Sequence, residues 1–342
     1  MKIWNHHLFS RVLIVIISVF FIAALSGCSS DSGESEDSTE NSTENSEATT
    51  SDNSDVTTID TKFGEVEITE EPVRVVALGW GDAETALSLG VEPVGASDWL
   101  DFGGDGVGPW LEGAYEESPT LIGTLEPDYE QIASLAPDLI LDVKSSGDKE
   151  RYERLSDIAT TIGVPEGGDN YLTSTEEQVQ MIAKALNKEE EGKKLLEELN
   201  AAFEQTAEEN PEFAEKTIAV AAYSSNGFGA YVDGDSRIDF VKRLGFETKQ
   251  EIEELADGNF YVEIADEQLE LLDADLTVVF PIWVDESEIT NNEMFQKIDS
   301  VADGRSIVLD LDSANAFSTG SIPSLLWAIE NITPKFAELL EN

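Results

Sequence analysis

The stretch EQIASLAPDL, Glu130–Leu139, recurs later in the chain as EQLELLDADL, Glu267–Leu276, and this repeat indicates how the chain is organised. In both copies a Leu follows the glutamate after five residues, an Asp after eight and another Leu after nine. An apolar run and then a Leu-Gly pair come before each copy. Each half therefore reads strand, helix, Leu-Gly, helix, Asp-Leu, strand. Two related α/β lobes are the economical interpretation, and a chance likeness between generic helix–strand units is the alternative.

Short apolar runs alternate with amphipathic segments along both halves. The runs are rich in Val, Ile and Leu without strict alternation, which is typical of strands that are covered on both faces. The segments between them place apolar residues at helical spacing. The predicted strands are Val73–Leu78, Pro93–Ala96, Leu139–Val143, Thr217–Tyr223, Leu276–Phe280 and Ile307–Leu311, and the predicted helices are Ala83–Leu89, Tyr129–Leu135, Arg237–Leu244 and Glu267–Leu272.

A long helical stretch separates the two halves. Thr175–Leu186 and Lys188–Glu208 are rich in Glu, Lys, Leu and Ala, which favour helix, and Pro211 ends the pattern. One helix of this length spans about 30 Å, so we expect a stiff connection. The predicted fold is α/β, with two Rossmann-like α/β lobes joined by a long α-helix.

The N-terminal sequence predicts secretion and a lipid anchor. Lys2 and Arg11 precede the apolar run Val12–Leu25, as in a secretory signal. Small residues then lead to Cys28, the only cysteine of the chain. This arrangement resembles the bacterial lipoprotein cleavage box, which implies cleavage before Cys28 and lipidation of its thiol. An ordinary signal peptide, or a short anchor helix with an incidental cysteine, is the alternative.

The segment after Cys28 predicts an acidic tether. Residues 29–58 are almost entirely Ser, Thr, Asp, Glu and Asn, without Lys or Arg. Such a segment buries too little apolar surface to offset chain entropy, and its like charges keep it extended. The predicted organisation is a signal peptide at 1–27, the lipidated cysteine and tether at 28–58, an N-terminal lobe at 59–173, a connecting helical segment at 174–211 and a C-terminal lobe at 212–342.

The composition argues against several classes of function. The chain has 71 acidic and 20 basic side chains, an excess that repels nucleic acid and anionic lipid surfaces. We interpret the excess as adaptation to high salt, which screens self-repulsion. Both histidines, His6 and His7, lie in the predicted signal, so the mature chain lacks the imidazole of catalytic triads and of most zinc sites. We predict no enzyme, no catalytic residue, no cofactor and no metal-ion site.

Six segments together resemble a known family. They are FGEVEITEEPVRVVALGWGDAETALSLGVEPVG (63–95), EPDYEQIASLAPDLIL (126–141), YERLSDIA (152–159), RIDFVKRLGF (237–246), IADEQLELLDADL (264–276) and AFSTGSIPSLLWAIENITP (316–334). They resemble the helix-linked substrate-binding proteins of ABC importers for ferric siderophores, haem and cobalamin, over nearly all residues from 60 to the end. The resemblance implies a ligand held between the lobes, small hinge closure and no chemistry on the ligand.

The resemblance also implies the partners. A ferric siderophore is the expected ligand, and haem or cobalamin bound in the same fold is the alternative. A carbohydrate-acting enzyme and an adhesive lipoprotein are further alternatives, but neither requires the six family-like segments. One surface glutamate in each lobe, at Glu130 and Glu267, is implied to dock on arginines of the permease. The alternative is that both are ordinary helix glutamates near an N-terminal turn. We expect a monomer at the extracytoplasmic membrane face, attached only through its lipid.

The ligand-binding candidates follow predicted strands, because ligands in such sheets bind beyond the carboxyl ends of the strands. Aromatic rings supply flat contact area, and Lys or Arg supplies charge for a polar or anionic metal centre. Lys144 and Arg237 are the expected charge partners, with surface ion pairs as the alternative. Catecholate binders of the family are commonly richer in cleft arginines than this chain, which argues against a strongly anionic triscatecholate. A neutral or cationic hydroxamate complex stays open. The candidates are Trp80, Trp99, Trp110, Lys144, Tyr223, Tyr231, Arg237, Trp283 and Phe317.

Overall fold

The computed structural model describes residues 56–123, 126–256 and 259–341. The predicted signal peptide, Cys28 and the tether up to residue 55 lie outside these residues. The α-helices are α1 (Asp82–Ser88), α2 (Tyr129–Ser134), α3 (Lys149–Ser156), α4 (Thr175–Ala185), α5 (Glu189–Glu209), α6 (Ser236–Arg243), α7 (Gln250–Glu253), α8 (Glu286–Thr290), α9 (Asp299–Ala302), α10 (Leu311–Thr319), α11 (Ile322–Asn331) and α12 (Thr333–Leu340). Four 3-10 helices are η1 (Pro109–Leu111), η2 (Pro211–Phe213), η3 (Asp266–Leu272) and η4 (Phe295–Lys297). No helix in the described ranges is both long and apolar enough to cross a membrane.

The N-terminal lobe is built on a parallel sheet in the order β5-β4-β3-β6-β7. Its strands are β3 (Val75–Ala77), β4 (Gly95–Ser97), β5 (Thr120–Ile122), β6 (Leu139–Leu141) and β7 (Thr160–Ile162). The chain adds β4 and β5 on one side of β3, and then β6 and β7 on the other. The strand order therefore reverses between β3 and β6, and this reversal leaves a crevice at the carboxyl ends of these two strands.

An antiparallel hairpin that was not predicted from the sequence precedes this sheet. Its strands are β1 (Thr57–Thr61) and β2 (Gly64–Ile68). Ile59 and Thr61 of β1 are buried, and β1 packs against α4. β1 thus begins two residues inside the segment that we predicted as tether, and two of its alternate side chains, Ile59 and Thr61, are buried.

The C-terminal lobe holds a mixed sheet in the order β11-β9-β8-β12-β13, with β10 also paired to β8. The strands are β8 (Thr217–Ser224), β9 (Gly227–Tyr231), β10 (Glu247–Thr248), β11 (Tyr261–Ile264), β12 (Leu276–Pro281) and β13 (Ser306–Val308). β10, β12 and β13 run parallel to their partners, whereas β9 is antiparallel to β8 and β11 is antiparallel to β9. The sequence of β9 lacks the apolar run that marks a strand, because Tyr261 covers Gly229 so closely that a Cβ there would lie 2.1 Å from the ring.

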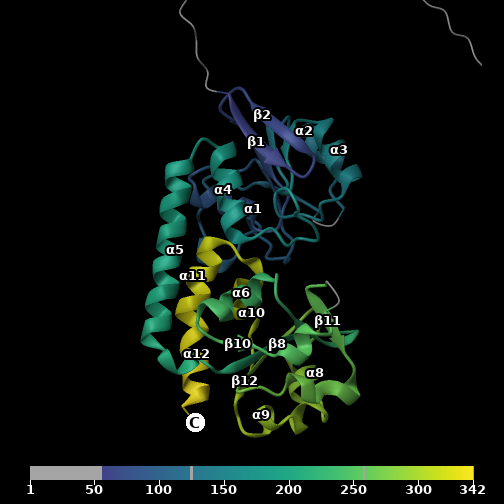
Figure 1. Ribbon diagram of the computed structural model, residues 1–342. Helices are drawn as coiled ribbons and strands as arrows, with labels where there is room; N and C mark the ends of the chain where they lie inside the picture. Colours follow the sequence, from purple (N-terminus) through teal and green to yellow (C-terminus); the bar gives the residue numbers. More distant parts are fainter. Residues whose placement is uncertain (1–55, 124–125, 257–258, 342) are drawn as a thin grey trace, which may run out of the picture. The chain divides into compact units, whose positions relative to one another are not determined.

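The helical connection differs in one detail from the single long helix that we predicted. It consists of α4 and α5, with a break at Asn187, whose φ is 55°. Ser174 and Glu177 form a capping box at the start of α4. Leu195 of α5 packs against the cores of both lobes, and α5 runs beside both in Figure 1. The prediction of two α/β lobes joined by a helical segment is confirmed.

Two aspartates explain why the repeat contains Asp-Leu. Asp138, just before β6, accepts hydrogen bonds from the backbone N–H groups of Val73 and Arg74, just before β3. Asp275, just before β12, accepts from the N–H and hydroxyl of Thr217, the first residue of β8. Each aspartate therefore ties together the starts of two neighbouring parallel strands, and it does so in the same way in both lobes.

The two copies of the repeat differ in their helical segments. Asp128 caps α2 by accepting from the N–H groups of Glu130 and Gln131. Ala265, at the equivalent place before η3, has no side chain that can do so. The segment that we predicted as an α-helix at Glu267–Leu272 is accordingly a 3-10 helix.

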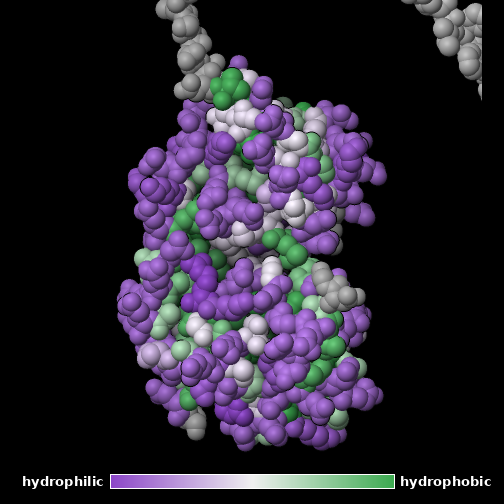
Figure 2. Space-filling model, viewed as in Figure 1, coloured by the Kyte–Doolittle hydropathy of each residue, from purple (hydrophilic) through white to green (hydrophobic). Residues whose placement is uncertain are grey.

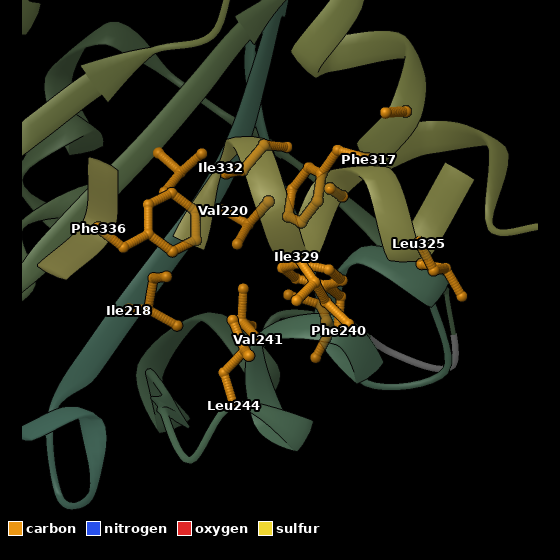
Figure 3. Packing of buried hydrophobic residues seen from close by; sticks show 14 of the residues in the cluster. Ile218, Val220, Phe240, Val241, Leu244, Phe317, Leu325, Ile329, Ile332 and Phe336 are labelled. Atoms are coloured by element: carbon orange, nitrogen blue, oxygen red, sulfur yellow. The ribbon is translucent and has the colours of Figure 1, made fainter. Parts of the chain in front are cut away.

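The core of the C-terminal lobe corrects two further predictions. The predicted strand Ile307–Leu311 is wrong at its end, because β13 stops at Val308 and Leu311 begins α10, which Asp310 caps. Phe317 then lies on α10 and not in a loop after a strand. Its side chain is fully buried against α6 and α11, where Figure 3 shows it facing Phe240 and Val220. A ring in this position packs the core and lies outside the lining of the cavity described below.

Candidate ligand cavity

A cavity of about 600 Å³ lies between the two lobes. From the N-terminal lobe it is lined by side chains that follow β3, β4 and β6 and by the segment 170–175. From the C-terminal lobe it is lined by residues after β8 and β12 and by the starts of α6 and α10. Most of the surface in Figure 2 is hydrophilic, and hydrophobic residues reach it at the level where the lobes meet. The crevice that the strand order predicts is thus present and open to the opposite lobe.

Three stacked rings form the wall of the cavity in the N-terminal lobe. Trp80, after β3, lies between Trp99 and Tyr171, with ring centroids 4.1 and 4.0 Å away and interplanar angles of 7° and 18°. Tyr171 has a left-handed φ of 64°, and its neighbour Asn170 has a φ of 48°. A non-glycine residue in this conformation is held there by its surroundings, which is common at ligand sites. Tyr171 was not among the predicted ligand contacts, because β7, the strand before this loop, was not predicted.

Aromatic rings also form the facing wall. Tyr231, at the end of β9, lies 5.1 Å from the ring of Tyr261 and 5.7 Å from that of Phe280. Phe260 and Tyr261 were missed, because the short strand β11 has no recognisable pattern in the sequence. Trp283 lines the rim of the cavity, with 89% of its surface exposed and a φ of 53°.

Arg237 is buried in the cavity wall but its charge is already paired. Its Nη1 donates to both carboxylate oxygens of Asp235 at 2.8 and 3.0 Å, and its Nε donates to the hydroxyl of Ser318 at 3.2 Å. The guanidinium also lies over the ring of Tyr231, with Cζ 4.3 Å from the centroid. The cavity wall therefore contains an ion pair of Arg237 and Asp235 whose charges cancel.

Lys144 is a different kind of cation. It follows β6, lines the cavity and is only 4% exposed. Among the described residues, its ammonium has neither a hydrogen-bond partner nor a carboxylate within ion-pair distance. Burial lowers the pKa of Lys144 below its ordinary value, and the nearby charge of Asp235 opposes that shift. An ammonium that is buried without a partner is costly, so a bound ligand that accepts from it gains the energy of that contact.

A buried carboxylate holds the loops that carry Trp80 and Lys144. Asp82 accepts hydrogen bonds from the N–H of Gly79 at 3.1 Å, from the N–H of Val143 at 2.8 Å and from Nε2 of Gln178 at 2.6 Å. Burial raises the pKa of Asp82 to about 6. Gly79 permits this close approach, since a Cβ there would lie 2.3 Å from the carboxylate. The loops after β3 and β6 are thereby fixed to each other.

A second buried carboxylate joins the two lobes beside the cavity. Glu84 of α1 accepts from the N–H of Gly108 at 3.1 Å and from Nε1 of Trp110 at 2.9 Å. It also accepts a short hydrogen bond from the hydroxyl of Ser321, which caps α11 in the other lobe. Trp110, predicted as a ligand contact, therefore packs at the lobe interface against Trp327 and does not line the cavity.

Ser321→Ala is expected to lower the free energy of unfolding by about 1–3 kcal/mol, because it removes both a helix cap and a donor to a buried carboxylate. Hydrogen exchange at the Gly108 amide should speed up, since the contact that closes this interface is lost. The control is Ser174→Ala, which removes the cap of α4 but no contact to Glu84. Equal exchange at Gly108 in wild type and Ser321→Ala would show that this bond does not hold the lobes.

The structure brings six of the nine predicted ligand-binding residues to the cavity and leaves three outside its lining. Tyr223, at the end of β8, stacks on Phe228 with ring centroids 4.6 Å apart, Trp110 binds Glu84, and Phe317 is in the core. The six that line the cavity are Trp80, Trp99, Lys144, Tyr231, Arg237 and Trp283.

Comparisons with known proteins agree with this architecture. The Fe(3+)-citrate-binding protein YfmC of Bacillus subtilis (strain 168) is 29% identical over 321 residues, which cover 90% of this chain and 93% of that protein. The structure of Staphylococcus aureus SirA complexed with staphyloferrin B superposes with a TM-score of 0.70 at 26% identity, over 82% of this chain and 98% of SirA. Streptococcus pneumoniae TIGR4 PiaA, solved in complex with ferrichrome, has the same fold, with a TM-score of 0.71 at 24% identity over 83% of this chain and 99% of PiaA.

The sequence profile of a binding-protein family matches residues 75–312 of the chain. This range contains the sheets of both lobes from β3 to β13, the helical connection and most of the cavity lining. It covers more than half of the chain and includes the whole repeat on which the two lobes are built. The chain belongs to the periplasmic binding protein family.

Proposed function

We propose that this protein is the substrate-binding lipoprotein of an ABC importer and that it captures a ferric siderophore. The observation that carries the proposal is the cavity between the lobes, walled on both sides by aromatic rings and containing one buried ammonium without a partner. The similarity to a ferric-citrate-binding protein over nearly its whole length, and to a structure with bound staphyloferrin B, supports an iron(III) chelate as the ligand.

The cavity has the properties that a chelate of this kind requires. Ligand pockets for organic molecules commonly measure ~300–1,000 Å³, and this one measures about 600 Å³. The stack of Trp80, Trp99 and Tyr171 offers a rigid flat surface to the organic edge of a chelate, at little cost in side-chain entropy. The connection through α4 and α5 keeps the two walls near each other without ligand.

The rest of the proposal concerns the location and the partner. The chain would be cleaved before Cys28, and the thiol of Cys28 would be lipidated. The lobes would then bind ligand at the extracytoplasmic face of the membrane, attached through an acidic tether. Glu130 and Glu267 would each dock on one permease subunit. Both side chains are exposed, and neither carboxylate has an ion-pair or hydrogen-bond partner among the described residues. Unpartnered carboxylates on both lobes are free to meet arginines of another protein.

Titration of the purified chain with ferric hydroxamate, ferric citrate or ferric catecholate complexes is expected to quench its tryptophan fluorescence. Trp80, Trp99 and Trp283 line the cavity, where a bound ferric complex absorbs their emission. Trp283→Phe should reduce the amplitude of the quench, whereas Trp327→Phe, outside the lining, should leave the ligand-dependent change intact. A response to haem, cobalamin or free ferric iron, with none to the chelates, would refute the assignment.

A further inference from the structure

We propose that the cavity selects ferric chelates of low net charge, neutral or monoanionic, and that Lys144 recognises them by donating to an oxygen of the chelating groups. This inference rests on the proposed function and specifies which chelates the cavity takes. It depends on the state of the four charged side chains that line the cavity among the described residues: Lys144, Arg237, Asp235 and Asp239.

Lys144 is the available donor. Its side chain is 4% exposed, and its ammonium lies beside Gly320 of the C-terminal lobe, where a Cβ would be 3.1 Å from Nζ. The nearest carboxylates, Asp235, Asp239 and Asp82, act on it only through space. No described residue accepts a hydrogen bond from it, and it therefore has three donor hydrogens for an oxygen that enters the cavity.

Arg237 differs from Lys144 because a carboxylate already balances its charge. Both of its bonds to Asp235 are within 3.0 Å, the Nε position is used by Ser318, and one face of the guanidinium lies on Tyr231. Its Nη2 has no hydrogen-bond partner among the described residues and could donate to a ligand, but the charge of the guanidinium is already balanced by Asp235, which is 5% exposed. Arg237 therefore adds no uncompensated positive charge to the cavity.

The remaining charges oppose a polyanionic ligand. Asp235 and Asp239 balance Arg237 and Lys144, and the cavity has no net positive charge to attract several negative charges. The walls add to this effect, because the faces of Trp and Tyr rings carry negative electrostatic potential. Like charges in a site of low dielectric repel strongly. A triscatecholate, whose iron complex carries three negative charges, would meet the ammonium of Lys144, the carboxylate of Asp239 and the neutralised pair of Arg237 and Asp235.

The test is a set of dissociation constants for the purified chain with four ferric complexes. They are a neutral trihydroxamate such as ferrichrome, the cationic ferrioxamine, ferric dicitrate and a ferric triscatecholate. We expect the neutral complex to bind about 100-fold more tightly than the triscatecholate and the dicitrate. Tightest binding of a polyanionic complex would overturn the inference while leaving the proposed function intact. Absence of binding by all four complexes would refute the proposed function instead.

Variants separate the role of Lys144 from the general acidity of the protein. Lys144→Met keeps the length of the side chain and removes the donor, and it should weaken binding of the neutral complex about 10- to 100-fold. Lys144→Glu should shift the preference toward ferrioxamine. The matched control is Lys193→Met on the surface of α5, where the same charge is lost far from the cavity lining and binding should not change. An unchanged dissociation constant for folded Lys144→Met would show that Lys144 does not recognise the ligand.

Discussion

Simultaneous Glu130→Ala and Glu267→Ala substitutions are expected to abolish ferric siderophore uptake and to leave ligand binding unchanged. The two glutamates stand at the same place in the repeated segment, one at the start of α2 and one at the start of η3. Both are exposed, and neither belongs to the cavity lining. Their removal therefore takes away one docking charge from each lobe without touching the ligand site. Charged contacts of this kind govern both the rate of association and the choice of partner.

The measurement is uptake of labelled iron by cells whose binding protein is the variant alone, together with a fluorescence titration of the purified variant. Each single substitution should reduce uptake in part, because one lobe can still dock. Glu150→Ala with Glu270→Ala is the matched control, since both residues are exposed glutamates near the same segments. Full uptake by the double variant, or a loss of ligand affinity, would contradict the docking proposal.

Arg151→Met is expected to lower the free energy of unfolding by about 3–5 kcal/mol. Arg151 of α3 and Asp142, just after β6, form a buried ion pair, with Nη2–Oδ1 at 2.6 Å and Nε–Oδ2 at 3.0 Å. Asp142 is 2% exposed and Arg151 is 7% exposed. The variant leaves the carboxylate of Asp142 buried without its partner, two residues away from Lys144. The N-terminal lobe, including the part of the cavity wall that contains Lys144, should therefore become less stable.

Urea unfolding measures this loss, with the midpoint compared at equal slope. The matched control lies on the same helix: Lys149→Met breaks the exposed pair with Glu153 and should leave the unfolding midpoint nearly unchanged. A similar small cost for Arg151→Met would mean that Asp142 finds water or another donor, and that the pair does not stabilise the lobe.

Much of the fold could be read from local patterns. The runs that form β3, β6, β8 and β12 are continuous apolar segments. Helices next to them in the sequence cover both faces of these strands, so the local pattern was enough to predict them. The repeat identified the two lobes because the same backbone requirement acts twice, at Asp138 and at Asp275. Short strands were missed for the opposite reason. β9 and β11 depend on each other and on the contact between Gly229 and Tyr261, which no local pattern records.

The lining of the cavity was likewise predicted only in part from the sequence. Choosing aromatic and basic residues that follow strands identified six residues that line the cavity, because the carboxyl ends of parallel strands meet at one edge. The rule failed for Phe317 because Leu311 begins a helix, and that helix turns the ring into the core. It failed for Trp110 because Glu84 holds the indole at the lobe interface.

Residue type and spacing along the chain were enough to predict the α/β class, to match Glu130 with Glu267 and to show that no histidine follows His7. Which of the two cations is free depends on packing between segments that lie far apart in the chain. Lys144 and Arg237 look alike in the sequence, as basic residues after strands. Arg237 meets Asp235 two residues away and is neutralised, whereas the fold buries Lys144 where no carboxylate comes within ion-pair distance among the described residues. The reason is physical: a charge is available for a ligand only when packing in three dimensions leaves it unpaired.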